Sequence, residues 1–184
     1  MSLDPELLQR AARIRLACFD VDGTLTDGGL VYHVLGEAKV FDVADGFGLK
    51  LLQEHGIHIA FITARRGEIV AARAKDLGVE HVVIASHDKA ASLREIAGRL
   101  GIDPAEAAHM GDDLNDLPAM AIAGLAAAPA NAHPWVAERV HWIARARGGH
   151  GAVREFCDLL LQARGLKEAI LARYGVGVGV GAPR

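Results

Sequence analysis

Short apolar runs alternate along this chain with segments whose apolar residues recur at helical spacing. The runs 15–20, 57–63, 81–85, 107–110 and 124–128 are nearly continuous, which is typical of strands covered on both faces. Between them lie the expected helices 45–55, 68–77, 88–100 and 114–123, the first three of which end before a glycine suited to a C-cap. This alternation predicts parallel βαβ units, and therefore an α/β fold with a doubly wound parallel sheet.

Four further segments complete the predicted organisation. A short amphipathic helix precedes the first strand, and residues 151–163 have the pattern of a strongly amphipathic helix. Residues 30–42 carry Val, Tyr and Phe on both sides of Leu35-Gly36-Glu37, which predicts a hairpin over that turn and a small flap at about 27–43. The last residues, 175–184, alternate glycine with valine, and ordering them is entropically unfavourable. We therefore expect one domain over 1–174 and a flexible tail.

Composition and charge narrow the classes of partner. The 184 residues carry a net charge of −3, so there is no basic footprint for nucleic acid and no polybasic patch for a membrane. No apolar run reaches the ~18–20 residues of a membrane span, and the first residues lack the pattern of a signal peptide. Cys18 and Cys157 have no metal-ligand spacing and are expected to be reduced in the core. We expect a cytoplasmic protein that acts on a small molecule.

Residues with chemical potential follow the predicted strands. Asp20 and Asp22 come after the first strand, Thr63 ends the second, Lys89 begins a helix, and Asp112 follows the fourth strand. The carboxyl ends of parallel strands share one edge of a sheet, so these side chains can converge. An aspartate pair there can hold a cation, attack an electrophile or move a proton. The carboxylates, lysine and hydroxyl together favour an oxygen-ligand Mg²⁺ site with a phosphoryl pocket, whereas no His/Cys cluster indicates zinc.

These motifs, in this order, resemble those of the haloacid dehalogenase (HAD) superfamily of phosphotransferases. The DxDG[T/V] motif stands at 20–24, the Thr motif at Thr63, the Lys motif at Lys89 and the GDD motif at 111–113. The resemblance implies that Asp20 is the nucleophile that forms an aspartyl-phosphate and that Asp22 is the general acid/base. It implies that Thr63 and Lys89 hold the phosphoryl group. It also implies that Mg²⁺ is held by the Asp20 side chain, the Asp22 backbone carbonyl and Asp112. Asp113 and Asp116 are expected to orient the loop and Lys89.

Longer segments resemble one branch of that superfamily, the 3-deoxy-D-manno-octulosonate (Kdo) 8-phosphate phosphatases. The matching segments are 20–32, 36–48, 111–116, 132–134 and 148–161. The resemblance implies a HAD-like domain without a large cap, hydrolysis of Kdo 8-phosphate in lipopolysaccharide precursor synthesis, and a homotetramer with active sites at subunit interfaces. It assigns substrate binding to Asp42, Asp45, Gly46, Lys50, Arg65 and Arg73. Arginine suits a sugar acid because its guanidinium binds a carboxylate in a bidentate fork.

Two positions depart from the family pattern, and other interpretations stay open. Ala64 stands where the family usually has glycine, and His150 where arginine is usual. These departures concern the choice of substrate more than the catalysis. The same chemistry on another acid sugar, such as a nine-carbon ketodeoxy acid 9-phosphate, is the nearest alternative. A non-catalytic scaffold of the same fold is a second alternative, which the intact Asp20 and Asp22 disfavour. His109, within an apolar strand, is expected to be a packing residue.

Overall fold

A six-stranded parallel sheet forms the centre of the protein. The computed structural model describes residues 4–34 and 36–176. The sheet has the order β5-β4-β1-β6-β7-β8, with both neighbours of the central β1 parallel to it. Its strands are β1 (Leu16–Phe19), β4 (His58–Ile62), β5 (His81–Val83), β6 (Ala107–Met110), β7 (Leu125–Ala128) and β8 (Trp142–Ile143). The chain leaves β1 toward β4 on one side and later returns to β6 on the other, so β1 lies at the switch point of the sheet.

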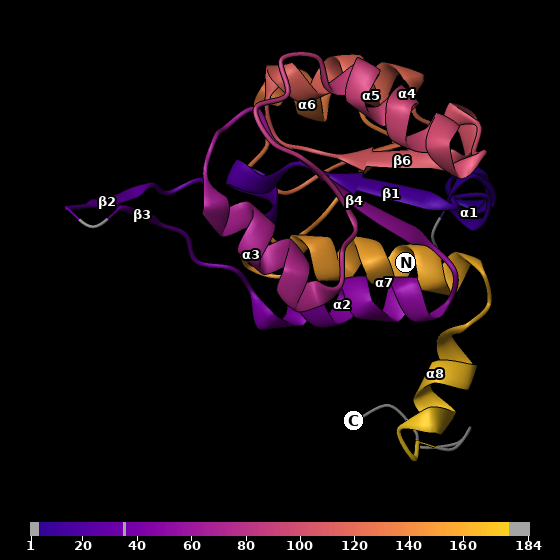
Figure 1. Ribbon diagram of the computed structural model, residues 1–184. Helices are drawn as coiled ribbons and strands as arrows, with labels where there is room; N and C mark the ends of the chain where they lie inside the picture. The colour runs from indigo at the N-terminus through magenta and orange to yellow at the C-terminus, as the bar shows by residue number, and fades with distance from the viewer. Residues whose placement is uncertain (1–3, 35, 177–184) are drawn as a thin grey trace.

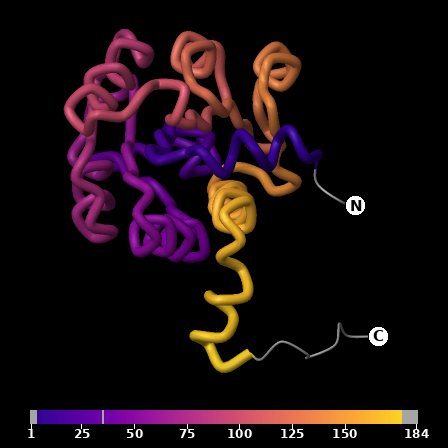
Figure 2. Tube along the Cα trace, turned by 90° about the vertical axis from the view of Figure 1, so that its right-hand side faces the viewer, coloured from indigo at the N-terminus to yellow at the C-terminus, as the bar shows by residue number. Residues whose placement is uncertain are grey.

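Helices cover both faces of the sheet (Figure 1). One face carries α1 (Pro5–Ala12), α2 (Val43–Glu54), α3 (Glu68–Leu77) and α7 (Ala152–Ala163). The other carries α4 (Lys89–Leu100), α5 (Leu117–Ile122) and α6 (Pro134–Ala137). The last helix, α8 (Lys167–Arg173), extends away from the body beyond α7 (Figure 2). No helix within 4–34 and 36–176 is long and apolar enough to cross a membrane.

The two faces of the sheet bury separate cores. Along β1, Ala17 and Phe19 pack with α2 and α7, whereas Leu16 and Cys18 pack with α4 and α5. This alternation follows from the two-residue period of a strand, and both sets are apolar because both faces are covered. The nearly continuous apolar runs of the sequence therefore correspond to a three-layer fold, and the predicted doubly wound sheet is confirmed.

The helix ends follow local capping chemistry. Asp42 and Asp88 accept hydrogen bonds from backbone N–H groups in the first turns of α2 and α4. Gly78 and Gly101 end α3 and α4 in the left-handed conformation that glycine adopts without strain. These stops return the chain to β5 and toward β6, and they place the start of α4 at the carboxyl edge of the sheet.

The predicted flap is present as a two-stranded hairpin that projects from the body (Figure 1). Its strands are β2 (Val31–His33) and β3 (Gly36–Ala38), paired with His33 opposite Gly36. The prediction of a turn at Leu35-Gly36-Glu37 was wrong for Gly36 and Glu37, which lie in β3, while Leu35 is outside the described residues. The pairing of β2 with β3 places Gly36 within a strand, so this glycine does not mark the turn of the hairpin.

Several boundaries differ from the sequence prediction for physical reasons. The expected helix 114–123 is a 3₁₀ turn, η3 (Leu114–Asp116), followed by α5, because Asp113 and Asp116 form a capping box. Helix α2 begins at Val43, two residues early, because Asp42 is its cap. Strand β8 and helices α6 and α8 were not predicted, since they are too short for a period to show. The turns η1 (Val21–Leu25) and η2 (Pro104–Glu106) complete the elements. Of the predicted tail, residues 177–184 lie outside the described residues.

Candidate active site

The loop after β1 carries the first motif into the centre of the carboxyl edge. Asp20 is 6% exposed, and its backbone N–H donates to the Met110 carbonyl at the end of β6. Gly23 has φ of 100°, and a Cβ there would lie 2.1 Å from Oδ2 of Asp112. Thr24 Oγ1 donates to Asp112 Oδ1 at 3.2 Å. The glycine therefore lets the Asp112 carboxylate approach the loop, and the threonine holds it there.

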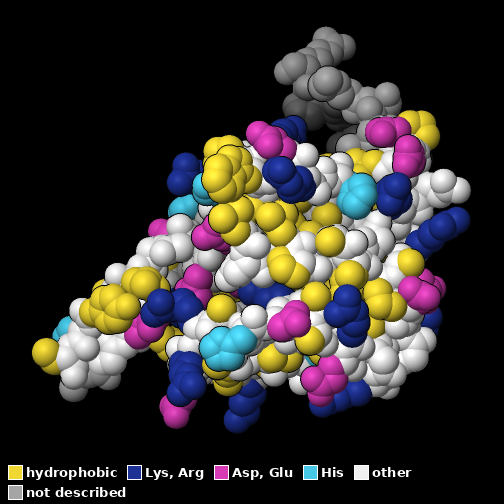
Figure 3. All heavy atoms as spheres, turned by 90° about the horizontal axis from the view of Figure 1, so that it is seen from above, with side chains coloured by type: hydrophobic (Ala, Val, Ile, Leu, Met, Phe, Trp, Pro, Cys, Tyr) yellow, Lys and Arg dark blue, Asp and Glu magenta, His cyan; other side chains and the backbone are white. Residues whose placement is uncertain are grey.

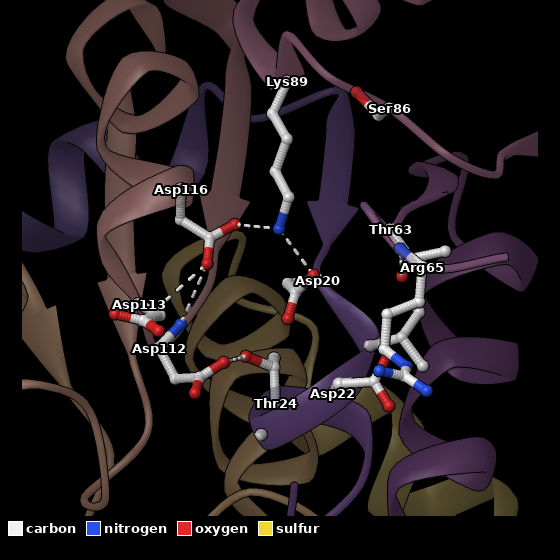
Figure 4. Close-up of polar contacts among 12 residues, drawn as sticks. Asp20, Asp22, Thr24, Thr63, Arg65, Ser86, Lys89, Asp112, Asp113 and Asp116 are labelled. Atoms are coloured by element: carbon white, nitrogen blue, oxygen red, sulfur yellow. Dashed lines mark hydrogen bonds and ion pairs between the residues drawn. The ribbon is translucent and has the colours of Figure 1, made fainter.

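A buried lysine joins two of the aspartates (Figure 4). Lys89 Nζ lies 2.5 Å from Asp20 Oδ1 and 2.6 Å from Asp116 Oδ1. The lysine side chain is 2% exposed and that of Asp116 is fully buried. Burial of charges at this level requires close pairing, because removing one partner leaves an uncompensated buried charge. Lys89 is thus fixed beside Asp20 rather than solvated at a helix surface.

Asp116 is saturated with hydrogen bonds. Besides Lys89, its Oδ1 contacts His109 Nε2 at 2.8 Å, and its Oδ2 accepts from the backbone N–H groups of Asp112 and Asp113. The prediction that Asp116 orients the loop and Lys89 is confirmed, whereas Asp113 caps η3. His109 does more than pack, since it anchors Asp116. A polar residue inside the apolar strand β6 was the only sequence signal for that role.

Three carboxylates, those of Asp20, Asp112 and Asp116, lie close together here, and Lys89 pairs with only two of them. Burial, and then the charge of Asp116, raises the pKa of Asp20 to about 6. Burial, and then the charge of Asp20, raises the pKa of Asp112 to about 7. Burial alone would raise the pKa of Asp116 as well, but the hydrogen bond from His109 and the charge of Lys89 lower it. Asp20 and Asp112 are therefore the carboxylates that a cation would stabilise most.

A second cluster surrounds Asp22 at the base of the flap. Lys39 Nζ donates to Asp22 Oδ1 and lies 2.8 Å from Glu37 Oε1. Arg65 Nη2 lies 3.1 Å from Glu37 Oε2, and its Nε lies 3.9 Å from Asp22 Oδ2. Figure 4 shows Arg65 beside Asp22, on the side of the site away from Lys89. Burial alone would lower the pKa of Lys39, but its hydrogen bonds to Asp22 and Glu37 raise it. Two acidic and two basic side chains thus form one cluster of contacts across the loop after β1 and the hairpin.

Thr63 directly follows β4 and contacts Arg65 of the second cluster. It is 1% exposed, and its Oγ1 accepts from the Arg65 backbone N–H at 3.1 Å. Its own backbone N–H donates to Val83 and its carbonyl accepts from Ser86, which ties the loops after β4 and β5 together. Ala64, the departure from the family pattern, is exposed. The structure therefore brings Asp20, Asp22, Thr63, Lys89 and Asp112 to one edge, with Arg65 beside them.

Asp42 and Asp45, which were also predicted to bind substrate, cap helices in this chain. The Asp42 side chain caps α2. Asp45 is 1% exposed, and its Oδ1 accepts from the Arg154 N–H at 2.7 Å, so it caps α7 from a neighbouring helix. Burial raises the pKa of Asp45 to about 6. The prediction that Asp45 binds substrate is not supported by this geometry, because its carboxylate is enclosed.

Gly46, Lys50 and Arg73 line one shallow groove between α2 and α3, together with Val43, Phe47, Asp76 and Leu77. Arg73 is fixed there by Asp76 at 2.8 Å and by the Asp42 carbonyl. Asp20, Asp22 and Asp112 do not line this groove. Within one chain, these three residues form a surface of their own.

Asn131 is a further support of the site that the sequence did not reveal. Its Nδ2 donates to the Gly23 carbonyl at 3.0 Å, and its Oδ1 accepts from the Gly148 N–H at 2.6 Å. A Cβ on Gly148 would lie 1.9 Å from the Gly23 carbonyl oxygen. This close approach explains a glycine there and supports the loop after β1. His150, two residues on, is exposed.

Known proteins are similar to this chain in both sequence and fold. The profile of the haloacid dehalogenase-like hydrolases matches residues 78–155. The chain is 42% identical over 160 residues to the 3-deoxy-D-manno-octulosonate 8-phosphate phosphatase KdsC of Yersinia pestis, which covers 86% of each chain. A hypothetical protein from Xanthomonas campestris has a TM-score of 0.91 and 52% identity, covering 95% of this chain and 96% of that one.

A third relative was solved with ligands. The phosphatase of the same description from Moraxella catarrhalis, in complex with magnesium, phosphate and KDO, has a TM-score of 0.89 and 39% identity, covering 92% of this chain and 98% of that one. Identity and coverage at this level extend over both the sheet and the motif-bearing loops. The chain belongs to the 3-deoxy-D-manno-octulosonate 8-phosphate phosphatase family of the haloacid dehalogenase-like hydrolases.

Proposed function

We propose that this protein is a Mg²⁺-dependent phosphatase that converts Kdo 8-phosphate to free Kdo and phosphate through an aspartyl-phosphate on Asp20. The observation that carries the proposal is the buried contact of Asp20 with Lys89, with Asp112 alongside. The relatives named above as phosphatases of this substrate support the choice of sugar.

The donor set fits a magnesium ion. Asp20, Asp112 and Asp116 each offer a carboxylate oxygen, and these oxygens lie within 4.8 Å of one another. Asp116 is already saturated by Lys89, His109 and two backbone N–H groups. We therefore assign the ion to Asp20 and Asp112, with the Asp22 backbone carbonyl as the family resemblance implies. Mg²⁺ prefers few protein ligands and retained water, and when bound it offsets the repulsion between phosphate and carboxylate.

The chain's own residues account for the two halves of the reaction. The free carboxylate oxygen of Asp20 attacks phosphorus, while Lys89 and Thr63 stabilise the negative charge of the transferring group. Asp22 gives a proton to the leaving sugar oxygen as the ester bond breaks. A water molecule then attacks the phosphorus of the aspartyl-phosphate and gives its proton to Asp22, which restores both side chains.

The cationic side chains around the site select the sugar. Arg65 lies beside Asp22, so it can meet the sugar where it leaves the phosphate. Gly46, Lys50 and Arg73 line a groove separate from this chain's own aspartates. We propose that these residues meet the substrate bound to a neighbouring subunit of a homotetramer. Hydrophobic side chains are visible on the projecting flap (Figure 3). Tyr32 is 74% exposed and Val34 is 95% exposed, which supports an interface at the flap.

Mixed oligomers test the shared site directly. Asp20→Asn subunits lack the nucleophile, and Arg73→Ala subunits lack a groove cation. If sites are shared, unfolding and refolding the two inactive variants together restores part of the activity. No recovery from a mixture that elutes as one oligomer in size-exclusion chromatography would contradict the shared site.

The proposal includes a cytoplasmic location and a place in the supply of Kdo for lipopolysaccharide. Both follow from the resemblance to the family. The two cysteines support the location, since Cys18 and Cys157 are buried free thiols.

A panel of phosphate esters tests the proposed substrate. The purified protein is assayed for phosphate release with Mg²⁺ and with EDTA, on Kdo 8-phosphate, on a nine-carbon ketodeoxy acid 9-phosphate and on simple hexose phosphates. We expect the highest kcat/KM on Kdo 8-phosphate and no turnover with EDTA. Preference for the nine-carbon ester would replace the substrate, and no turnover of any ester would favour a scaffold.

A further inference from the structure

Lys39, at the base of the flap, is a buried cation that no catalytic motif of the sequence includes. It follows β3, its side chain is 3% exposed, and it contacts Asp22 on the catalytic loop and Glu37 on the hairpin. Lysine is almost never buried to this degree unless its charge is paired. Its position is therefore determined from two sides, by the catalytic loop and by the flap.

This contact makes the two carboxylate oxygens of Asp22 unequal. Oδ1 is taken by Lys39, whereas Oδ2 is buried and, among the described residues, has no hydrogen-bond partner. Arg65 Nε is also buried without a hydrogen-bond partner in the same part of the chain, and it lies 3.9 Å from that Oδ2. Buried polar atoms without partners are unfavourable and call for an explanation.

A single oxygen atom between these two groups would satisfy both. It would accept a hydrogen bond from Arg65 Nε and share a proton with Asp22 Oδ2, at ordinary hydrogen-bond lengths. The position lies beside Asp22, on the side of the site away from Lys89, where the leaving half of a phosphate ester would lie (Figure 4). The two unsatisfied atoms are therefore the groups that the leaving oxygen of a bound substrate would meet.

We infer that Lys39 is a positioning residue for proton transfer: by holding Oδ1 of Asp22, it directs Oδ2 toward the leaving oxygen. The inference rests on the proposed function. As the bond between phosphorus and the leaving oxygen breaks, its electron pair stays with that oxygen, which takes the proton from Oδ2. The water that later attacks phosphorus returns a proton to Oδ2. Lys39 keeps its own protons, and it couples this step to a docked flap because Glu37 holds it from the hairpin.

Esters with different leaving groups separate this role from a merely structural one. The sugar alkoxide needs a proton to leave, whereas p-nitrophenolate leaves without one, and kcat/KM reports only the steps up to that departure. We compare Lys39→Met with wild type on Kdo 8-phosphate and on p-nitrophenyl phosphate. General acid catalysis contributes about 10²–10⁴-fold, so we expect a loss of about 30-fold or more on the sugar ester and under about threefold on the aryl ester.

Two further variants complete the design. Lys75→Met removes an exposed lysine on α3 and should match wild type on both esters. In an Asp22→Asn background, Lys39→Met should cause no additional loss on the sugar ester, because its effect passes through Asp22. Should thermal unfolding show that Lys39→Met is not folded, Lys39→Gln replaces it with the same expectation.

An equal loss on both esters, or an additional loss in the Asp22→Asn background, would overturn the role of Lys39. The proposed substrate would be overturned by a different result, namely that the wild-type protein hydrolyses p-nitrophenyl phosphate but does not hydrolyse Kdo 8-phosphate. In that case the same comparison is made with glycerol 3-phosphate, whose leaving group is also an alkoxide, and the test of Lys39 stands.

Discussion

Two clusters of charge flank the attacking position, and they are built differently. The Asp20 cluster consists of Asp20, Lys89, Asp116 and His109, all held by the parallel sheet and the helices that follow it, and each is at most 6% exposed. The Asp22 cluster joins Asp22, Lys39, Glu37 and Arg65 across the catalytic loop and the hairpin, and Arg65 is 36% exposed. The first cluster suits a reaction that needs fixed charges, and the second suits a region that meets variable substrate atoms.

This contrast implies a division of labour. The Asp20 cluster would act on any phosphate ester, because it faces the phosphoryl group. The Asp22 cluster would act on the leaving half and would therefore decide which ester reacts. Variants in each cluster test that division, and the greatest loss is expected in the Asp20 cluster.

Lys89→Met removes the cation of the Asp20 cluster. Asp20 and Asp116 then repel each other and the incoming phosphate, so kcat/KM should fall by about 10³-fold on every ester, as expected for loss of one charge-stabilising donor. Steady-state assays on Kdo 8-phosphate and p-nitrophenyl phosphate measure this, with the exposed Lys75→Met as control. A loss confined to the sugar ester would break the division.

Arg65→Met removes the cation of the Asp22 cluster that is most open to solvent. A charged hydrogen bond contributes about 1.5–3 kcal/mol, so kcat/KM on Kdo 8-phosphate should fall by about 10–100-fold. The aryl ester should change little. The neighbouring Arg66 is exposed, and Arg66→Met is the matched control. Equal losses for Arg65→Met on both esters would place Arg65 with the phosphoryl-binding residues.

Asp45→Ala separates a helix cap from a substrate contact. Because Asp45 accepts the Arg154 N–H, its loss should lower the free energy of unfolding by about 1–2 kcal/mol, while kcat/KM stays near wild type. Denaturant unfolding and activity are measured together, with the exposed Glu80→Ala as control. Unchanged stability with a large rise in KM would return Asp45 to substrate binding.

The dependence of stability on pH and Mg²⁺ reports on the carboxylates of Asp20 and Asp112. The pKa values of Asp20 and Asp112 are raised to about 6 and about 7, so the metal-free folded protein binds protons more tightly than the unfolded chain. The stability they contribute is fully present below the unfolded value of about 4 and is lost as pH rises through 6 to 7.

Mg²⁺ should therefore raise the Tm more at pH 8 than at pH 5, where protons compete with it. Each kcal/mol of difference corresponds to about 2–4 °C. The pKa of Asp45 is also raised, to about 6. Its titration shifts the Tm in the same direction with and without Mg²⁺, so its contribution cancels when the two Tm values are compared. An equal effect of Mg²⁺ at both pH values, measured by thermal unfolding with EDTA as reference, would remove Asp20 and Asp112 as its ligands.

The same contrast explains which residues the sequence could predict. Asp20, Thr63, Lys89 and Asp112 stand at the ends of strongly patterned elements, and in a parallel sheet those ends must meet. Their order along the chain therefore carried enough information to place them. Asp116 was predicted to orient Lys89 for the same reason, since it follows the same strand.

Residues whose role depends on tertiary docking were not predictable in this way. Lys39 stands after a three-residue strand, and nothing in the local pattern indicates that the hairpin base packs on Asp22. Asp45 stands at the start of a predicted helix, and nothing in the local pattern indicates that its carboxylate lies in the interface of α2 and α7. Strand β8 is two residues long, which is too short for a period to reveal.

The variant Asp20→Asn tests whether Asp20 is the nucleophile. This change keeps the size of the side chain but removes the attacking oxygen's charge. With Mg²⁺ and Kdo 8-phosphate, we predict that phosphate release falls by at least about 10⁴-fold, as for loss of the nucleophile in other covalent catalysts. Phosphate release within tenfold of wild type would contradict the account.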